Sequence, residues 1–181
     1  KCDQNLARLH KAGIQGVRTV SGDACELDAV LTSFDAMLGK PVLFDTVFID
    51  APCSGTGTMR RHPEIPWRLT EKDVTTELPR LQLTMLKEAA ARVAAGGELI
   101  YATCSVFDEE NTQVVDAFLS SLEGADFSLA PLSEAQILQL PDFAQAKKLV
   151  SVRQNDRGLF QSVPVNVDSY DGHFCARLVH K

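Results

Sequence analysis

The 181-residue chain is long enough for one domain with a buried core, and its 45% hydrophobic and 23% charged residues are typical of a globular protein. A net charge of −6 excludes a protein that binds nucleic acid through a broadly cationic surface, but it allows a local basic patch. No apolar run approaches the roughly 18 residues of a membrane span and no signal-peptide pattern opens the chain, so we expect no membrane partner.

The first elements predicted are two helices with a short strand between them. A helical pattern runs from Asp3 to Ala12 and ends at a glycine. Alternation predicts a strand over Val17–Val20, closed by Ser21-Gly22-Asp23. Residues 25–37 form the second predicted helix, which Gly39-Lys40-Pro41 ends.

A buried strand, a long loop and the clearest helix of the chain come next. The strand covers Leu43–Ile49, and the loop covers residues 53–75, a length that in compact domains is usually functional. The helix that follows is predicted to end at Gly96-Gly97. Its apolar residues recur at spacings of three and four, on one face: Leu78, Leu81, Met85, Leu86, Ala89 and Val93.

Another strand and helix complete the alternating pattern. Glu98–Thr103 is the strand, and Asp108 is the predicted N-cap of the helix, with Glu109 and Glu110 in its first turn. The apolar face of this helix consists of Val114, Val115, Phe118, Leu119 and Leu122. Strands that alternate with helices in this way indicate parallel βαβ units.

The last part of the chain changes character. Residues 131–158 contain two prolines and give only a weak helical signal at 133–140. Leu159–Val167 and His173–Val179 read as two strands around a polar turn, which predicts an antiparallel hairpin at the sheet edge. We therefore expect residues 1–181 to form a single α/β domain, with a mostly parallel sheet and a C-terminal antiparallel hairpin.

The number and spacing of the five cysteines argue against a structural metal site and against a disulfide framework. No C-x-x-C pair occurs, so no structural zinc site is predicted. An odd, dispersed set favours a reducing, cytoplasmic location. The five are Cys2, Cys25, Cys53, Cys104 and Cys175.

Two of these cysteines follow predicted strands directly. Cys53 lies in the string Asp50-Ala51-Pro52-Cys53-Ser54-Gly55-Thr56-Gly57, and Cys104 lies in Thr103-Cys104-Ser105. Ligands bind at the carboxyl ends of strands in open α/β sheets. The positive end of the helix predicted at Asp108 would favour a thiolate at Cys104. An isolated cysteine here would be read as buried and inert, but two matching strand ends predict chemistry.

These strings resemble the signature motifs of the Sun/Fmu family of RNA cytosine-C5 methyltransferases, of the ribosomal-RNA type. The resemblance covers nearly the whole chain and implies a Rossmann-like class I methyltransferase sheet, the methyl donor S-adenosyl-L-methionine and an RNA substrate. Further similar strings are Arg60-Arg61-His62-Pro63, Gln82 with Leu86, Ala95-Gly96-Gly97, Glu109-Glu110-Asn111 and Asp171-Gly172-His173-Phe174.

The resemblance also implies roles for particular residues. It implies that Cys104 is the nucleophile that adds to C6 of cytosine and that Cys53 assists release of the product. It implies that Asp50 lies between the donor and the base, and that Asp23 and Pro52 belong with Asp50 to the donor site. From the residues alone, Asp23 reads as the N-cap of the following helix.

Parts of the family pattern are absent from the chain. The glycine-rich turn after the first strand and the acidic residue that ends the second strand have no counterpart, so the N-terminal strands of the sheet are missing. Because the chain opens on Lys1 within a helical pattern, we expect it to be a C-terminal portion of a catalytic domain. The alternative is a piece that completes its sheet by swapping or self-association.

A basic cluster follows the Cys53 turn and consists of Arg60, Arg61, His62 and Arg68. On composition alone it is a solvated loop, but its place next to the predicted site favours contact with RNA. Two other functions stay open. A noncatalytic RNA-binding or assembly module would explain the missing glycine turn, and an amino-directed methyltransferase would need no second cysteine.

Overall fold

The computed structural model describes residues 2–133, 136, 154–164 and 170–181. The chain divides into two compact units, Lys1–Val42 and Leu43–Lys181, which we describe separately. The helix weakly predicted at 133–140 lies largely outside the described residues. The end of the strand predicted over Leu159–Val167 and the start of the turn after it also lie outside them. None of the helices in the described part of the chain combines the length and apolar character that a membrane span requires.

The first unit contains helices α1 (Cys2–Lys11) and α2 (Leu27–Leu38), with a 3-10 helix η1 (Ala24–Glu26) before α2. Gly39 has a φ of +67° and ends α2 in the left-handed conformation, as its sequence predicts. The prediction of a strand over Val17–Val20 is wrong, since these residues adopt no regular structure. A strand needs a hydrogen-bonded neighbour, and the described part of this unit offers none.

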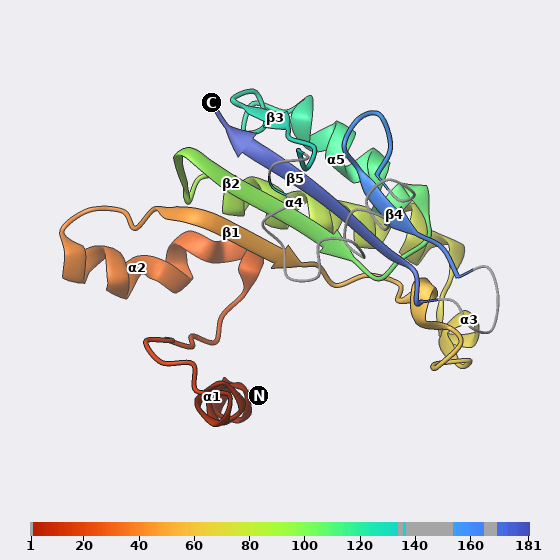
Figure 1. The fold of residues 1–181 in the computed structure, drawn as a ribbon, viewed down its shortest axis with the longest axis horizontal. Coiled ribbons are helices and arrows are strands. Elements are labelled where there is room, and N and C mark those ends of the chain that lie inside the picture. The colour runs from red at the N-terminus through yellow and green to blue at the C-terminus, as the bar shows by residue number, and fades with distance from the viewer. Residues whose placement is uncertain (1, 134–135, 137–153, 165–169) are drawn as a thin grey trace. The chain divides into compact units, whose positions relative to one another are not determined.

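The second unit is built on a sheet in the order β1-β2-β5-β3, with β4 also paired to β5 (Figure 1). The α/β class is thus confirmed. The parallel share is smaller than predicted among the described strands, because β1 and β2 are parallel while β5 is antiparallel to its three neighbours. The strands are β1 (Phe44–Asp50), β2 (Val93–Thr103), β3 (Phe127–Leu129), β4 (Phe160–Ser162) and β5 (His173–His180).

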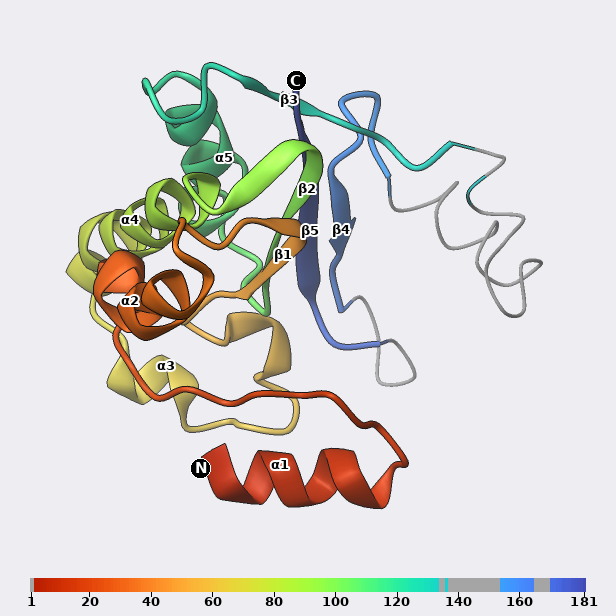
Figure 2. The same ribbon diagram turned by 90° about the vertical axis from the view of Figure 1, so that its left-hand side faces the viewer.

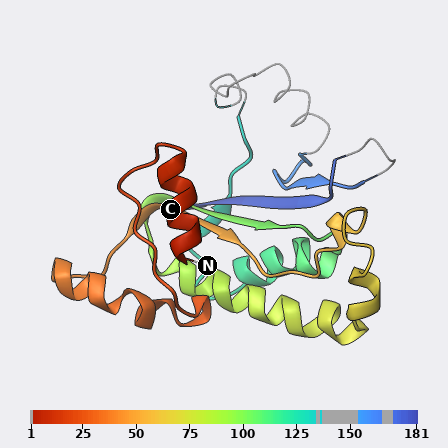
Figure 3. The ribbon, with the colours of Figure 1, turned by 90° about the horizontal axis from the view of Figure 1, so that it is seen from below.

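Helices α4 (Leu78–Ala90) and α5 (Thr112–Leu119) cover one face of this sheet (Figures 2 and 3). Alternate residues of β2 and β5 point to this face and pair in register, as Leu99 does with Leu178 and Tyr101 with Ala176. Each large apolar side chain buried here contributes roughly 1.5–3 kcal/mol to folding. The core includes Ile49, Leu86, Leu99, Tyr101, Val115, Phe118, Phe174 and Leu178.

The helix before β2 begins earlier and ends earlier than the sequence predicts. Thr70 and Asp73 form a reciprocal cap, in which Thr70 N and Oγ1 donate to the Asp73 carboxylate and Asp73 N donates to Thr70 Oγ1. A π-helical turn, η3 (Asp73–Glu77), then leads into α4. The predicted loop over residues 53–75 also holds the 3-10 helix η2 (Thr56–Thr58) and the short helix α3 (Ile65–Arg68).

The sequence predicts that Gly96-Gly97 ends a helix. In the structure the pair lies inside β2. Val93, expected on the helix face, is already the first residue of the strand. Gly96 has a φ of +74°, and a Cβ on Gly97 would lie 2.9 Å from the Asp45 carbonyl oxygen. The pair therefore allows an irregularity in the β1–β2 register and a close approach of β2 to β1.

Three further expectations need correction. The strand predicted as buried, β1, buries only Ile49, and Phe48 is 62% exposed; β1 also ends the described sheet order. Leu122, assigned to the face of α5, lies beyond its end and is 92% exposed. The late hairpin forms, but β5 lies between β2 and β3 rather than at the edge.

Candidate active site

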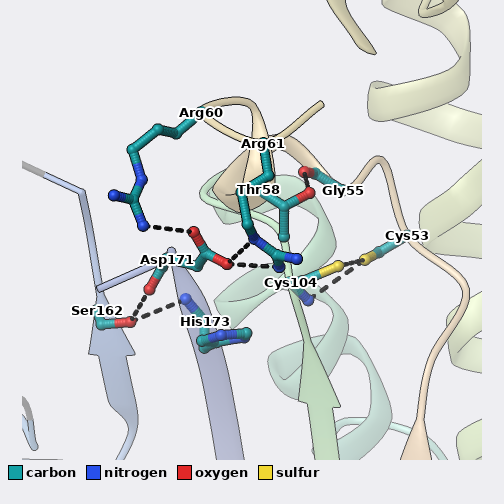
Figure 4. Close-up of polar contacts among 9 residues, drawn as sticks. All are labelled: Cys53, Gly55, Thr58, Arg60, Arg61, Cys104, Ser162, Asp171 and His173. Carbon is teal, nitrogen blue, oxygen red and sulfur yellow. Dashed lines mark hydrogen bonds and ion pairs between the residues drawn. The ribbon is translucent and has the colours of Figure 1, made fainter. Parts of the chain in front are cut away.

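The two cysteines singled out from the sequence meet at the ends of neighbouring parallel strands. Cys104 follows β2 directly, and Cys53 follows β1 by three residues. Their Sγ atoms are 3.2 Å apart, and the backbone N–H of Cys104 donates to Cys53 Sγ at 3.3 Å (Figure 4). The parallel register, which pairs Asp50 with Ala102, brings the two turns side by side.

The contact between the thiols separates their acidities. The hydrogen bond with Cys53 lowers the pKa of the Cys104 thiol to about 7, because it stabilises the thiolate. The same hydrogen bond, together with burial, raises the pKa of Cys53. Cys104 is therefore the thiol that is available as a nucleophile near neutral pH.

The sequence predicts that the positive end of a helix beginning at Asp108 favours the Cys104 thiolate. In the structure this helix begins elsewhere. Asp108 is not an N-cap but the first residue of a 3-10 helix, η4 (Asp108–Glu110), and α5 begins only at Thr112. The hydrogen bond with Cys53 is the main cause of the lowered pKa of Cys104, and the charges of Asp50 and Glu110 oppose it.

Glu110 is fully buried between the two cysteine turns, a position that sequence reasoning missed. The sequence predicts it in the first turn of a helix, where it would favour the helix dipole. In the structure its carboxylate instead accepts hydrogen bonds from Ser54 N at 2.8 Å, Ser105 Oγ at 2.6 Å and Gln82 Nε2 at 2.9 Å. The available signal was the string Glu109-Glu110-Asn111, which fits the family pattern but indicates nothing about burial.

Asn111 holds the other side of the Cys104 turn. Its Oδ1 accepts from Thr103 Oγ1 at 2.6 Å, and its Nδ2 donates to the Ser105 carbonyl at 3.0 Å. The residues on both sides of Cys104 are thus fixed by one buried amide. A side chain on a turn held in this way is held in one position by its supporting hydrogen bonds.

The predicted donor-site residues fall in both units. Asp50 is exposed at the end of β1, where its charge raises the pKa of Cys104, and the exposed Pro52 accepts a hydrogen bond from Gln82 Nε2 at its carbonyl, 3.0 Å away. Asp23 belongs to the first unit. There it caps η1, with Oδ1 accepting from Cys25 N at 2.9 Å, in agreement with the N-cap interpretation of its sequence.

Two arginines of the basic cluster pair with an acidic residue that the sequence did not connect to them. Arg61 Nε donates to Asp171 Oδ2 at 2.7 Å, and Arg60 lies 3.7 Å from Oδ1 (Figure 4). Arg61 lowers the pKa of Asp171. Both arginine side chains remain at least half exposed, while His62 lies 3.5 Å from Glu64 and Arg68 ends α3.

Backbone contacts join the loop after Cys53 to β2 and to the segment before β5. Gly57 N donates to the Cys104 carbonyl at 2.8 Å, and Gly172 N donates to the Gly57 carbonyl at 2.9 Å. A Cβ on Gly57 would lie 2.1 Å from the Gly172 oxygen, so only glycine fits. Gly57 and Gly172, from two separate family-like strings, thus meet at the site.

A mostly apolar cavity of about 370 Å³ is lined by residues of the loop after Cys53 and by Phe107. Its lining includes Thr56, Met59, Leu69, Val74 and Phe107 and neither cysteine. Among the residues that the structure describes, no group of three His, Cys, Asp or Glu side chains is arranged to hold a metal ion.

Curated relatives match the chain over less than half of its length. A ribosomal RNA small subunit methyltransferase B of Klebsiella pneumoniae (strain 342) is 45% identical over 83 residues, which are 46% of this chain and 19% of the relative. The protein of the same name from Proteus mirabilis (strain HI4320) is 45% identical over 82 residues, or 45% and 19%. The matched part of the chain thus spans about a fifth of these relatives.

Solved structures share the fold over almost the whole chain. The crystal structure of PH0851 matches with a TM-score of 0.73 and 28% identity, over 97% of this chain and 34% of that one. The crystal structure of NSun6 from Pyrococcus horikoshii with SFG matches with a TM-score of 0.68 and 21% identity, over 98% and 38%. The Rossmann-like methyltransferase fold implied by the sequence is thereby confirmed.

The sequence motifs, the converging thiols and the fold all agree with one family model. The model described as 16S rRNA methyltransferase RsmB/F matches residues 1–179, nearly the entire sequence. This match includes both cysteine turns and the Asp171-Gly172 segment that closes on them. The chain belongs to the RsmB/F family, the Sun/Fmu group of 16S rRNA methyltransferases.

Proposed function

We propose that the chain carries the catalytic cysteines of an RNA cytosine-C5 methyltransferase that acts on ribosomal RNA and uses S-adenosylmethionine. The observation that carries the proposal is the pair of thiols 3.2 Å apart, with the pKa of Cys104 lowered to about 7. Family membership supports ribosomal RNA as the substrate. An amino-directed methyltransferase needs no second thiol, so the pair favours C5.

The chemistry explains why a thiolate is needed. Cytosine C5 belongs to an aromatic ring and is a poor nucleophile. When Cys104 Sγ adds to C6, a C6–S bond forms, the C5–C6 double bond is lost, and electron density moves toward C5 and N3. C5 would then bond to the methyl group as the methyl–sulfur bond of the donor breaks and leaves a neutral thioether. Loss of the C5 proton to a base restores the double bond as the C6–S bond breaks and the thiolate leaves.

We assign Cys53 to the second half of this reaction. Its own pKa is raised, so at neutral pH it holds a proton that it shares with Cys104 Sγ across 3.2 Å. A protonated thiol beside the C6–S bond stabilises the departing thiolate of Cys104 by hydrogen bonding. We therefore assign adduct formation to Cys104 and adduct breakdown to Cys53.

The residues at the end of β1 suit the methyl donor. Bound S-adenosylmethionine supplies an electrophilic methyl group on a positively charged sulfur. Asp50 offers an exposed carboxylate at this edge of the sheet, which would attract that positive charge and, by the family resemblance, lie between donor and base. The resemblance also assigns Pro52 and Asp23 to the donor, Asp23 to its adenine part.

The decisive experiment is adduct trapping in the full-length enzyme that contains this chain, with RNA and donor, on a denaturing gel at pH 8.5. Cys53→Ala should accumulate a covalent protein–RNA species, because the thiol that helps remove Cys104 is gone. Cys104→Ala should form none. Cys175→Ala, a half-buried cysteine on β5 outside the site, is the matched control and should behave as the unsubstituted chain. An adduct in Cys104→Ala would mean that the roles are reversed.

The same experiment separates the enzyme from a noncatalytic RNA-binding module. Such a module would bind RNA through the basic cluster and form no covalent species with any cysteine variant. RNA binding without an adduct in Cys53→Ala would therefore favour the module.

A further inference from the structure

We propose that Glu110 is the positioning residue of the thiol pair: its buried carboxylate bridges the two cysteine turns and sets the distance between Cys53 and Cys104. This inference rests on the proposed function only in assigning the thiols to catalysis. The bridge itself is a statement about two turns and one side chain, and its test needs neither RNA nor donor.

Each oxygen of the carboxylate holds one turn. Oε2 accepts from the backbone N–H of Ser54, which directly follows Cys53. Oε1 accepts from the hydroxyl of Ser105, which directly follows Cys104. Because the two oxygens belong to one rigid planar group, the residues after both cysteines are held at a fixed separation.

The Ser105 hydroxyl has little freedom to turn elsewhere. Its oxygen accepts from Phe107 N at 3.1 Å and from Ser54 Oγ at 3.1 Å, so its own hydrogen is directed to Glu110 at 2.6 Å. The Ser54–Ser105 hydroxyl contact is a second direct link between the turns. The carboxylate thus anchors a small buried network rather than one isolated hydrogen bond.

Glu110 is itself fixed from a third element. Gln82 of α4 donates through Nε2 both to Glu110 Oε2 and to the Pro52 carbonyl, at 2.9 and 3.0 Å. The Tyr101 hydroxyl donates to the Glu110 carbonyl at 2.6 Å. The bridge is therefore tied to the helix layer and to β2.

The described partners of this carboxylate are uncharged donors, which is unusual for a buried acidic side chain. Taking a carboxylate out of water is costly, and three hydrogen bonds offset that cost without any cation. A cation here would also lower the pKa of Cys104 further, whereas Glu110 raises it. The site thus keeps an acceptor-only group whose chief effect is geometric.

The bridge has a consequence for Cys104 that a merely structural role would not have. The groups that face Cys104 are the thiol of Cys53, which lowers its pKa, and the carboxylates of Asp50 and Glu110, which raise it. If the turns drift apart, the hydrogen bond with Cys53 weakens while both negative charges stay nearby. The pKa of Cys104 must then rise.

The test is the pH profile of alkylation by iodoacetamide in the full chain, with each cysteine followed by peptide mass spectrometry. Ser105→Ala removes one arm of the bridge, together with the Ser54–Ser105 contact, and leaves the charge. Glu110→Asp keeps the charge and that contact but is too short to span both turns. We expect each to move the Cys104 midpoint upward from about 7 by roughly one pH unit. Ser121→Ala, which removes a serine hydroxyl bonded to Phe118 O, is the control and should not move it.

The outcomes are separable. A wild-type Cys104 profile in Ser105→Ala, with unchanged thermal unfolding, would overturn the bridge. If Glu110→Asp fails to fold, Ser105→Ala still decides. Because the profile is measured without RNA, the expected shifts in the chain together with no RNA adduct in the full-length enzyme would refute the proposed function and leave this inference intact.

Discussion

At the residue scale, the reactivity of Cys104 depends on one neighbour more than on any helix. We predict that Cys53→Ala raises the pKa of Cys104, since it removes the hydrogen bond that stabilises the thiolate. The thiolate is present above the pKa, so a higher pKa moves alkylation to higher pH. For a shift of one unit, the rate at pH 7 would fall several-fold.

This prediction is checked by the alkylation profile of Cys104, with Cys175→Ala as the control. The thiol of Cys175 has a pKa raised by burial and does not contact the pair, so its loss should leave the Cys104 profile unchanged. A profile of Cys104 that is the same with and without Cys53 would show that another group sets its acidity.

The second residue-scale prediction concerns Gly57. Gly57→Ala would place a Cβ within 3 Å of three backbone atoms of Gly172, and backbone cannot rotate away as a side chain can. We expect a loss of about 2 kcal/mol or more in the free energy of unfolding, measured by urea denaturation. Leu122→Ala, at a side chain that is 92% exposed, should change it little. Unchanged stability in Gly57→Ala would mean that the contact relaxes freely.

The sequence predicts the cysteines of the site but not their supports. A strand that ends in a polar turn is a local pattern, so both thiols and Asp50 could be found from short strings. Glu110 meets Ser54 across 56 residues of sequence, and Asp171 meets Arg61 across 110. Nothing local distinguishes a buried acceptor from a solvated acidic residue, because its partners come from other elements.

At the element scale, the cap formed by Thr70 and Asp73 explains why the helical stretch starts before the apolar pattern does. Thr70→Ala removes the hydroxyl that caps Asp73 N, and we expect it to cost about 1 kcal/mol of folding free energy in urea denaturation. Thr76→Ala, at an exposed threonine inside the same helical stretch, should be neutral or slightly stabilising. Equal effects of the two substitutions would argue against the cap.

Element types were predicted better than element boundaries and neighbours. Helical periodicity predicts α4 and α5, but the Gly96-Gly97 pair also predicts a helix end, because glycines commonly end helices. Only the close approach of β1 shows that these glycines serve a strand. Similarly, Val17–Val20 alternates like a strand, but alternation alone cannot supply the neighbour that a strand requires.

At the scale of the whole molecule, the missing glycine-rich turn bears on the donor. We predict that the 181-residue chain by itself binds S-adenosylmethionine weakly or not at all, since Asp23, Asp50 and Pro52 are all that the resemblance assigns to the donor site. Isothermal titration calorimetry is the measurement. Micromolar affinity would mean that the pocket is formed by other residues, and Asp50→Asn would then show whether its carboxylate takes part.

The basic cluster is the part of this acidic chain that we expect to contact RNA phosphates. Its ion pairs with Asp171 mean that substitutions there affect both RNA binding and stability. Arg60 and Arg61 share Asp171, whose side chain is only 12% exposed, so replacing both arginines removes phosphate contacts and also leaves a nearly buried carboxylate without its cations. We expect Arg60→Ala with Arg61→Ala to weaken RNA binding and to lower thermal stability. Arg68→Ala, at the end of α3, should weaken binding with little effect on stability.

Salt dependence separates the two effects. Each lost phosphate contact should reduce the slope of log affinity against log salt by about 0.7 for single-stranded RNA, whereas a folding defect lowers the amount of active protein at every salt concentration equally. The measurement is RNA affinity of the full-length enzyme across several salt concentrations, with donor affinity measured in parallel on the same preparation. Donor affinity should stay unchanged, because the cluster is expected on the RNA side of the site. An unaltered slope in all three substitutions would mean that the cluster is a solvated loop that does not contact RNA, and that Arg60 and Arg61 only form ion pairs with Asp171. A loss of donor affinity would instead mean that the Arg61–Asp171 pair, through the Gly57–Gly172 contact, supports the pocket.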